Sequence, residues 1–81
     1  MVKLVYYGEL RTLTGVREES AEAGSMHDVL KEIEVRHGAA AAKAAKRSTI
    51  TLDGVGVSKP NGKTPLQEHC ELCFFPVCGG G

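Results

Sequence analysis

The sequence predicts an α+β fold in which one main helix packs across a mixed sheet of four to five strands. Several short segments are rich in β-branched and aromatic residues and are bounded by turn residues, which is typical of strands. One longer segment, residues 25–38, instead repeats its apolar residues with helical spacing. A helix lying across a sheet is the economical way to bury a single apolar stripe.

Chain length and charge balance limit the classes of function. The 81 residues predict one domain, residues 1–81, with a modest core and a flexible C-terminal Gly-Gly tail. Ten basic and ten acidic residues cancel, so neither nucleic acid nor a membrane is expected as a direct partner. No apolar stretch approaches the roughly 20 residues that span a bilayer, and the N-terminus lacks a signal-peptide core. We therefore expect a cytoplasmic protein.

The first strand is predicted over the apolar run Val2 to Tyr7, which ends at Gly8. Its composition is typical of a buried, central strand. Residues 9–15 are predicted to form a loop that ends at Gly15. The segment from Val16 to Ala23 is polar and charged, and it can pair as an edge strand with one side in solvent.

The main helix is predicted from Ser25 to Gly38. Ser25 and Asp28 resemble a capping box, and Gly38 is a typical C-terminal stop. Apolar residues at helical spacing form its buried stripe: Met26, Val29, Leu30 and Ile33. His37 lies in the last turn, where the helix dipole alone explains a cationic side chain, so we do not predict it as a site residue.

The second half of the chain is predicted to alternate short elements and turns. The alanine-rich segment Ala39 to Arg47 is either a short second helix or a mobile connection. Asp53-Gly54 is the dipeptide expected at the tight turn of a β-hairpin. Further along the chain come a turn at residues 60–62, a helical turn at residues 64–66, and a last strand from Glu71 to Val77.

This element order corresponds to the β-grasp arrangement of ubiquitin-like proteins. If the first and last strands are central neighbours, one set of side chains lies under the helix: Leu4, Tyr6, Leu72 and Phe74. A second set faces away: Val5, Tyr7, Cys73 and Phe75. Together with Pro76 and Val77, Tyr7 and Phe75 would form an exposed apolar patch that marks a partner surface. The alternative is that the alanine segment or a loop covers this patch.

Three cysteines are crowded near the C-terminus: Cys70, Cys73 and Cys78. An odd number in one segment suits reduced thiols better than a disulfide framework. The spacing of Cys70 and Cys73 is compatible with a metal or redox site, but a second Cys/His pair is missing from the sequence, and a zinc site needs about four ligands. We expect Cys70 and Cys73 to be packing or edge residues, and no bound metal. The role of Cys78 stays open.

The chain ends in three glycines, Gly79, Gly80 and Gly81. Glycine has no Cβ, so this tail can enter a narrow active site and present its terminal carboxylate there. The tail is therefore suited to being a substrate of another protein. The alternative is a frayed terminus, as at many chain ends.

The start of the chain, from Val2 to Arg11, and its ending, from Phe74 to Gly81, resemble the MoaD/ThiS family of ubiquitin-like sulfur carriers. The resemblance covers nearly the whole chain and is strongest to the small subunit of molybdopterin synthase. It implies that an E1-like enzyme joins Gly81 to AMP, that a sulfur donor converts the end into a thiocarboxylate, and that a larger synthase subunit uses this sulfur to make molybdopterin.

The resemblance also implies a division of labour between the chain and its partners. Gly81 would carry the sulfur and Gly79 and Gly80 would pass through the partner's narrow channel. Four residues would dock the partner: Tyr7, Phe75, Pro76 and Val77. ATP and magnesium would be used by the activating partner, with no cofactor bound here. We expect no catalytic residues in this chain, because no catalytic constellation is visible in the sequence.

Three other functions fit the same residues. The chain could be a ubiquitin-like modifier linked through Gly81 to lysines of target proteins. It could carry sulfur for tRNA thiolation or thiamine synthesis. A plain β-grasp interaction domain is the remaining alternative, and it would not need a free terminal carboxylate.

Overall fold

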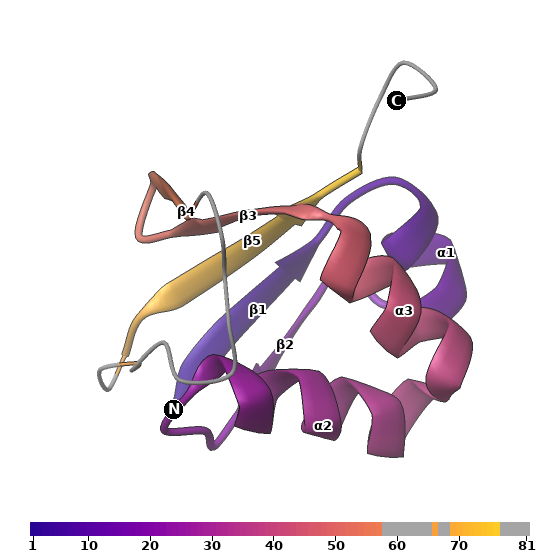
Figure 1. Cartoon of the computed structure of the whole chain (residues 1–81), viewed down its shortest axis with the longest axis horizontal. Coiled ribbons are helices and arrows are strands. Elements are labelled where there is room, and N and C mark those ends of the chain that lie inside the picture. The colour runs from indigo at the N-terminus through magenta and orange to yellow at the C-terminus, as the bar shows by residue number, and fades with distance from the viewer. Residues whose placement is uncertain (58–65, 67–68, 77–81) are drawn as a thin grey trace.

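The computed structural model describes residues 1–57, 66 and 69–76, and it has one mixed sheet of five strands in the order β2-β1-β5-β3-β4 (Figure 1). The mixed α+β, β-grasp architecture expected from the sequence is confirmed. Two predicted features, the turn at residues 60–62 and the tail from Val77 to Gly81, lie outside the described residues, as does most of the helical turn at residues 64–66.

The centre of the sheet is the parallel pair of β1, Val2–Tyr6, and β5, Glu71–Phe75. Leu4 lies opposite Leu72 and Tyr6 lies opposite Phe74, and all four side chains are fully buried. This is the pairing that the two apolar runs predict. Because parallel neighbours end at the same edge of a sheet, the C-terminal ends of β1 and β5 lie together.

The outer strands are antiparallel to their neighbours. β2, Glu18–Ala21, pairs with β1 at one edge, as predicted for the polar segment. β3, Thr49–Leu52, and β4, Val55–Val57, form the predicted hairpin at the other edge. Asp53 and Gly54 have φ angles of 50° and 85°, which is the geometry of a type I′ turn. Asp53 also accepts a hydrogen bond from the backbone N–H of Glu71 at 2.8 Å.

Helix α2, Met26–His37, has the predicted bounds and cap. The Ser25 Oγ accepts a hydrogen bond from the backbone N–H of Asp28 at 3.3 Å. The Asp28 carboxylate accepts from the backbone N–H of Gly24 rather than from that of Ser25, so the reciprocal bond of the capping box is displaced by one residue. The helix ends at Gly38, whose N–H donates to the Glu34 carbonyl.

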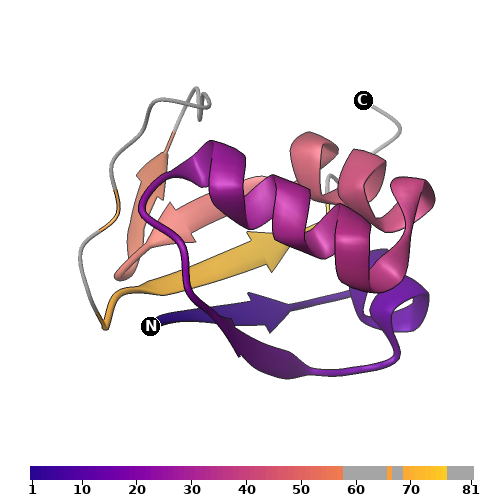
Figure 2. The same ribbon diagram turned by 90° about the horizontal axis from the view of Figure 1, so that it is seen from below.

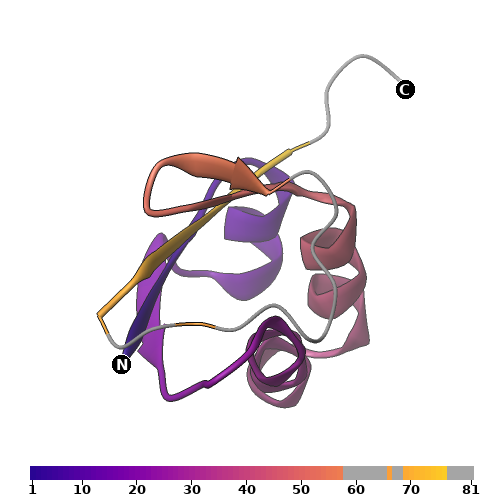
Figure 3. The same cartoon turned by 60° about the vertical axis from the view of Figure 1, so that its left-hand side comes forward.

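The alanine-rich segment is an ordered helix, α3, Ala39–Arg47, so the helical alternative is confirmed. Ala41, Ala44 and Ala45 are buried and belong to the core. Side chains of this size let α3 lie close to α2, which compensates for the absence of large apolar anchors. Figures 2 and 3 show α2 and α3 together on one side of the sheet.

The predicted loop at residues 9–15 is wrong, because Glu9–Thr14 forms helix α1. This helix has six residues and one buried side chain, Leu10, which is 1% exposed. So short a segment contains only one pair of apolar residues at helical spacing, Leu10 and Leu13, which is too little to predict a helix from the sequence. Its stability comes from Leu10, which closes the end of the core, and from the hydrogen bond of the Gly15 N–H to the Arg11 carbonyl.

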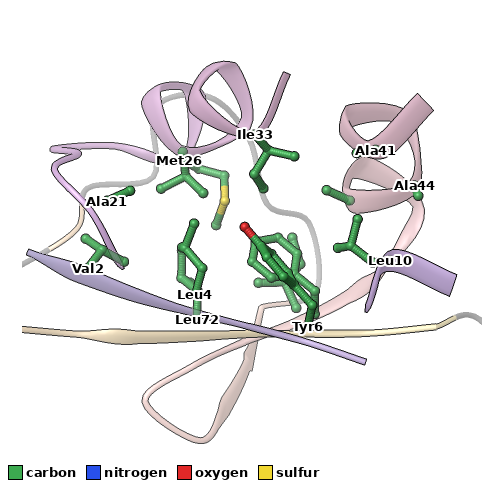
Figure 4. Close-up of a cluster of buried hydrophobic side chains, with 14 of the residues drawn as sticks. Val2, Leu4, Tyr6, Leu10, Ala21, Met26, Ile33, Ala41, Ala44 and Leu72 are labelled. Atoms are coloured by element: carbon green, nitrogen blue, oxygen red, sulfur yellow. The ribbon is translucent and has the colours of Figure 1, made fainter. Parts of the chain in front are cut away.

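The core lies between the sheet and the helices. Figure 4 shows Met26 and Ile33 pointing toward Leu4, Leu72 and Tyr6 of the sheet, with side chains of α1 and α3 closing one end. Within the described part of the chain, no helix is long and apolar enough to cross a membrane.

Candidate partner-docking site

The predicted docking residues Tyr7 and Phe75 lie at the edge where β1 and β5 both end. The Tyr7 backbone N–H donates to the Phe74 carbonyl at 3.1 Å and so holds the two chain segments together. The two rings are stacked, with centroids 4.7 Å apart and planes 8° from parallel. Phe75 follows the buried Phe74, so it faces away from the core and is 36% exposed.

Arg11 of α1 adds a cation to this pair of rings. Its guanidinium carbon lies 5.4 Å from the centroid of the Tyr7 ring, within the range of a cation–π interaction. Its Nε–H donates to the carbonyl of Tyr6 at 3.2 Å. The Tyr7 ring therefore contacts both the guanidinium of Arg11 and the ring of Phe75. Sequence analysis did not assign Arg11 a role, because its position depends on the unpredicted helix α1.

Pro76 continues this surface and packs against Gly8. A Cβ built onto Gly8 would lie 2.9 Å from Cγ of Pro76, too close for an unstrained contact. Gly8 also has a φ of +60°, which disfavours other residues. A glycine at position 8 therefore lets the chain pass close to the end of β1 as it leaves β5.

We call Tyr7, Arg11, Phe75 and Pro76 the docking surface. Pro76 and Phe75 are exposed, whereas Tyr7, which contacts Arg11 and Phe75, is half-buried, so the predicted patch is less open at Tyr7 than expected. The alternative in which the alanine segment covers the patch is wrong, because α3 packs against α1 and α2 on the core side. The other predicted site residues, Val77, Gly79, Gly80 and Gly81, lie outside the described residues.

Cys70 and Cys73 are both buried, as expected of packing residues, with exposed fractions of 3% and 9%. Burial raises the pKa of the Cys73 thiol, and its neighbour Glu71, whose carboxylate accepts from Sγ at 3.6 Å, acts in the same direction. Cys73 is therefore held as a neutral thiol. Among the residues that the structure describes, no group of three or more His, Cys, Asp or Glu side chains could hold a metal ion. Cys78 lies outside those residues.

A second polar cluster joins β2 to the end of α2 and is centred on Glu19. One carboxylate oxygen, Oε2, accepts from the Tyr6 hydroxyl at 2.5 Å and lies 2.6 Å from Nε2 of His37. The other, Oε1, accepts from Arg36 Nη1 at 3.2 Å. The interpretation of His37 from the helix dipole alone was incomplete, because its ring also contacts this carboxylate.

The Glu19 cluster changes the protonation equilibria of its members. Burial raises the pKa of the Glu19 carboxyl, but hydrogen bonds from Tyr6 and His37 outweigh burial and hold this pKa below its usual value. Burial, together with the hydrogen bond to Glu19, raises the pKa of Tyr6 well above its usual value. The cluster lies on the helical side of the sheet, away from Phe75, and we assign it a structural role.

The five-stranded sheet, the helix across it and the apolar root of a glycine tail define a ubiquitin-like β-grasp protein. The ThiS family model matches residues 4–81, so this chain belongs to the ThiS family. The expected membership of the MoaD/ThiS group of ubiquitin-like sulfur carriers is thereby confirmed. A comparison with curated protein sequences found no significant match.

Solved structures with the same fold span this chain almost completely. Small archaeal modifier protein 1 (SAMP1) from Methanosarcina acetivorans is 21% identical, with 99% of this chain and 95% of that chain covered and a TM-score of 0.81. A chain of the Amycolatopsis orientalis BexX/CysO complex is 20% identical, with 100% of both chains covered and a TM-score of 0.80.

A third similar structure is a chain in the complex of subunits 1 and 2 of molybdopterin-converting factor from Helicobacter pylori 26695. It is 19% identical, with 98% of this chain and 97% of that chain covered and a TM-score of 0.70. Identities at this level establish a shared fold.

Proposed function

We propose that this chain is a sulfur carrier for molybdopterin biosynthesis, and that its reacting group is the carboxylate of Gly81. The observation that carries the proposal is the match to the ThiS family, which extends through the glycine tail to residue 81. The docking surface supports it, because the stacked rings of the half-buried Tyr7 and the exposed Phe75 lie where the chain leaves the sheet toward that tail.

The proposed chemistry begins with activation of the tail. A carboxylate is a poor electrophile, so an E1-like enzyme would let it attack the α-phosphorus of ATP, with release of pyrophosphate. A hydrosulfide ion delivered by the sulfur donor would then attack the acyl carbon, AMP would leave, and the product would be the thiocarboxylate of Gly81. ATP and magnesium would be bound by the activating enzyme. This chain would be the co-substrate of these steps and the non-catalytic subunit of the final synthase complex.

The sheet and the tail would have separate tasks in this scheme. The docking surface would bind the partner, and Val77 would extend the contact. Gly79 and Gly80 would then pass through a channel too narrow for side chains, so that Gly81 reaches the reacting groups. We place these reactions in the cytoplasm, where thiols such as Cys70 and Cys73 stay reduced.

The choice of molybdopterin is supported by the terminal sequence and by similarity to a chain in a complex of molybdopterin-converting factor subunits. In the proposal, the second subunit receives the thiocarboxylate and transfers its sulfur to a pterin precursor. The second candidate function is protein modification through Gly81, which the similarity to SAMP1 favours.

Intact-mass analysis tests the proposal. The purified chain is incubated with an E1-like enzyme from the same organism, MgATP and a sulfur donor, and a variant with one residue appended after Gly81 is the control. We expect the native chain alone to gain the mass difference between sulfur and oxygen, and the product to support molybdopterin formation by the larger subunit. Absence of this mass gain would contradict the proposal, and a ladder of conjugates on a gel would favour the modifier.

A further inference from the structure

We propose that Arg11 is a specificity-determining residue of the docking surface, and that the enzyme which adenylates the tail presents a carboxylate side chain to its guanidinium. This inference rests on the proposed function, because it states the chemistry of the partner that would activate Gly81.

The guanidinium of Arg11 is held in place, and no acidic group in the described part of the chain neutralises it. Its Nε–H is used by the Tyr6 carbonyl, and its planar group lies over the Tyr7 ring. No hydrogen bond or ion pair within the described residues uses its two Nη atoms. An arginine oriented by one backbone hydrogen bond and one ring loses little further conformational entropy when a carboxylate binds its free edge.

The acidic residue on the same helix does not compensate this charge. Glu9 is turned toward α3, where its carboxylate lies 3.7 Å from Nη2 of Arg47. Arg36 on α2, in contrast, pairs with both Glu19 and Glu32. Among the residues that the structure describes, Arg11 therefore has no ion-pair partner, and it contributes a positive charge to the edge of an aromatic surface.

This combination of groups fits a partner surface that is apolar at its centre and acidic beside it. Arginine and tyrosine are enriched among the residues that dominate binding energy at interfaces. Rings that exclude water around an ion pair strengthen it relative to a fully exposed pair. A carboxylate accepts two parallel hydrogen bonds from a guanidinium edge, a geometry that lysine cannot reproduce.

The test uses ATP–pyrophosphate exchange catalysed by the E1-like enzyme of the same organism, with the full-length chain as varied substrate. We expect Arg11→Gln to raise KM about tenfold and Arg11→Glu to raise it further, with kcat changed less than about twofold, because a lost docking contact weakens binding rather than chemistry. The matched control is Lys31→Glu, which makes the same charge change as Arg11→Glu at an exposed position of α2 and should leave KM unchanged.

Two further measurements separate docking from stability. KM for the native chain should rise with salt concentration, and Arg11→Gln should flatten that rise, because a lost ion pair can no longer be screened. Arg11→Lys keeps the charge but loses the Nε–H bond to Tyr6, so it should retain more activity than Arg11→Gln. A raised KM for Arg11→Gln that keeps the salt dependence of the native chain would mean that Arg11 acts through the fold alone, and would overturn the inference.

The result for the native chain distinguishes the inference from the function on which it rests. If the native chain supports no pyrophosphate exchange, the proposed function fails. If it does support exchange and Arg11→Glu has an unchanged KM, the proposed function stands and the role of Arg11 is refuted.

Discussion

The ring of Tyr7 lies nearly parallel to that of Phe75 at a centroid distance of 4.7 Å, although 67 residues lie between them in the chain. The parallel pairing of β1 with β5 produces this contact, because it brings the ends of the first and last strands to one edge. The same pairing buries Tyr6 and Phe74 on the opposite face. A single register thus defines both the centre of the core and the docking surface.

Phe75→Asp should weaken binding to the activating enzyme by about 2 kcal/mol or more, because it places a charge in an apolar contact. Unfolding stability should change much less, since Phe75 is 36% exposed. Titration calorimetry and thermal unfolding measure the two effects. Val35→Asp, at an exposed apolar position of α2, is the control and should not alter binding. An unfolded Phe75→Asp variant would show that this ring belongs to the core.

Deletion of Gly80 and Gly81 should abolish adenylation and leave the fold intact. Terminal residues of this kind contribute little buried area, so we expect a stability change within about 0.5 kcal/mol. Circular dichroism reports on the fold, and pyrophosphate exchange reports on activation. If truncation removes the native circular dichroism spectrum, the tail contributes to the fold, and the hypothesis that it acts only as a substrate is contradicted.

Glu19→Gln should make the protein less sensitive to acid. The pKa of Glu19 is lowered in the folded state, so its stabilising contribution is present above the ordinary carboxyl pKa of about 4.3 and is lost as pH falls through the lower, folded value. Denaturant unfolding of both proteins between neutral pH and about pH 3 tests this. The difference in unfolding free energy between the native protein and Glu19→Gln should shrink as pH falls. A constant difference would be evidence against the Glu19 cluster as the cause of the acid sensitivity.

Local patterns in the sequence predict most of the fold. Helix α2 has a capping serine, four apolar residues at helical spacing and a terminal glycine, and the hairpin has Asp53-Gly54. Helix α1 could not be predicted in this way, because it contains one buried residue, Leu10, and is stabilised by the end of the core. Local propensity is a weak guide for so short a segment.

The candidate site was predicted in part for a related reason. Tyr7, Phe75 and Pro76 could be assigned because strand alternation and adjacency to the tail are visible in the sequence. Arg11 could not, since its contact with Tyr7 depends on helix α1. The Glu19 cluster depends on register, because Glu19 lies opposite the inward-facing Leu4 and therefore points toward α2. Such contacts are set by tertiary structure rather than by neighbours in the chain.

Gly8→Ala should destabilise the protein more than Gly15→Ala does. Both glycines have a positive φ, +60° and +76°, so both substitutions incur backbone strain of about 1 kcal/mol. A Cβ at Gly15 meets nothing within 4 Å, whereas one at Gly8 would lie 2.9 Å from Pro76. The difference between the unfolding free energies of the two variants, measured with denaturant, therefore isolates the cost of the contact with Pro76. Equal destabilisation would mean that Pro76 moves aside freely, and that Gly8 does not fix where the chain leaves the sheet.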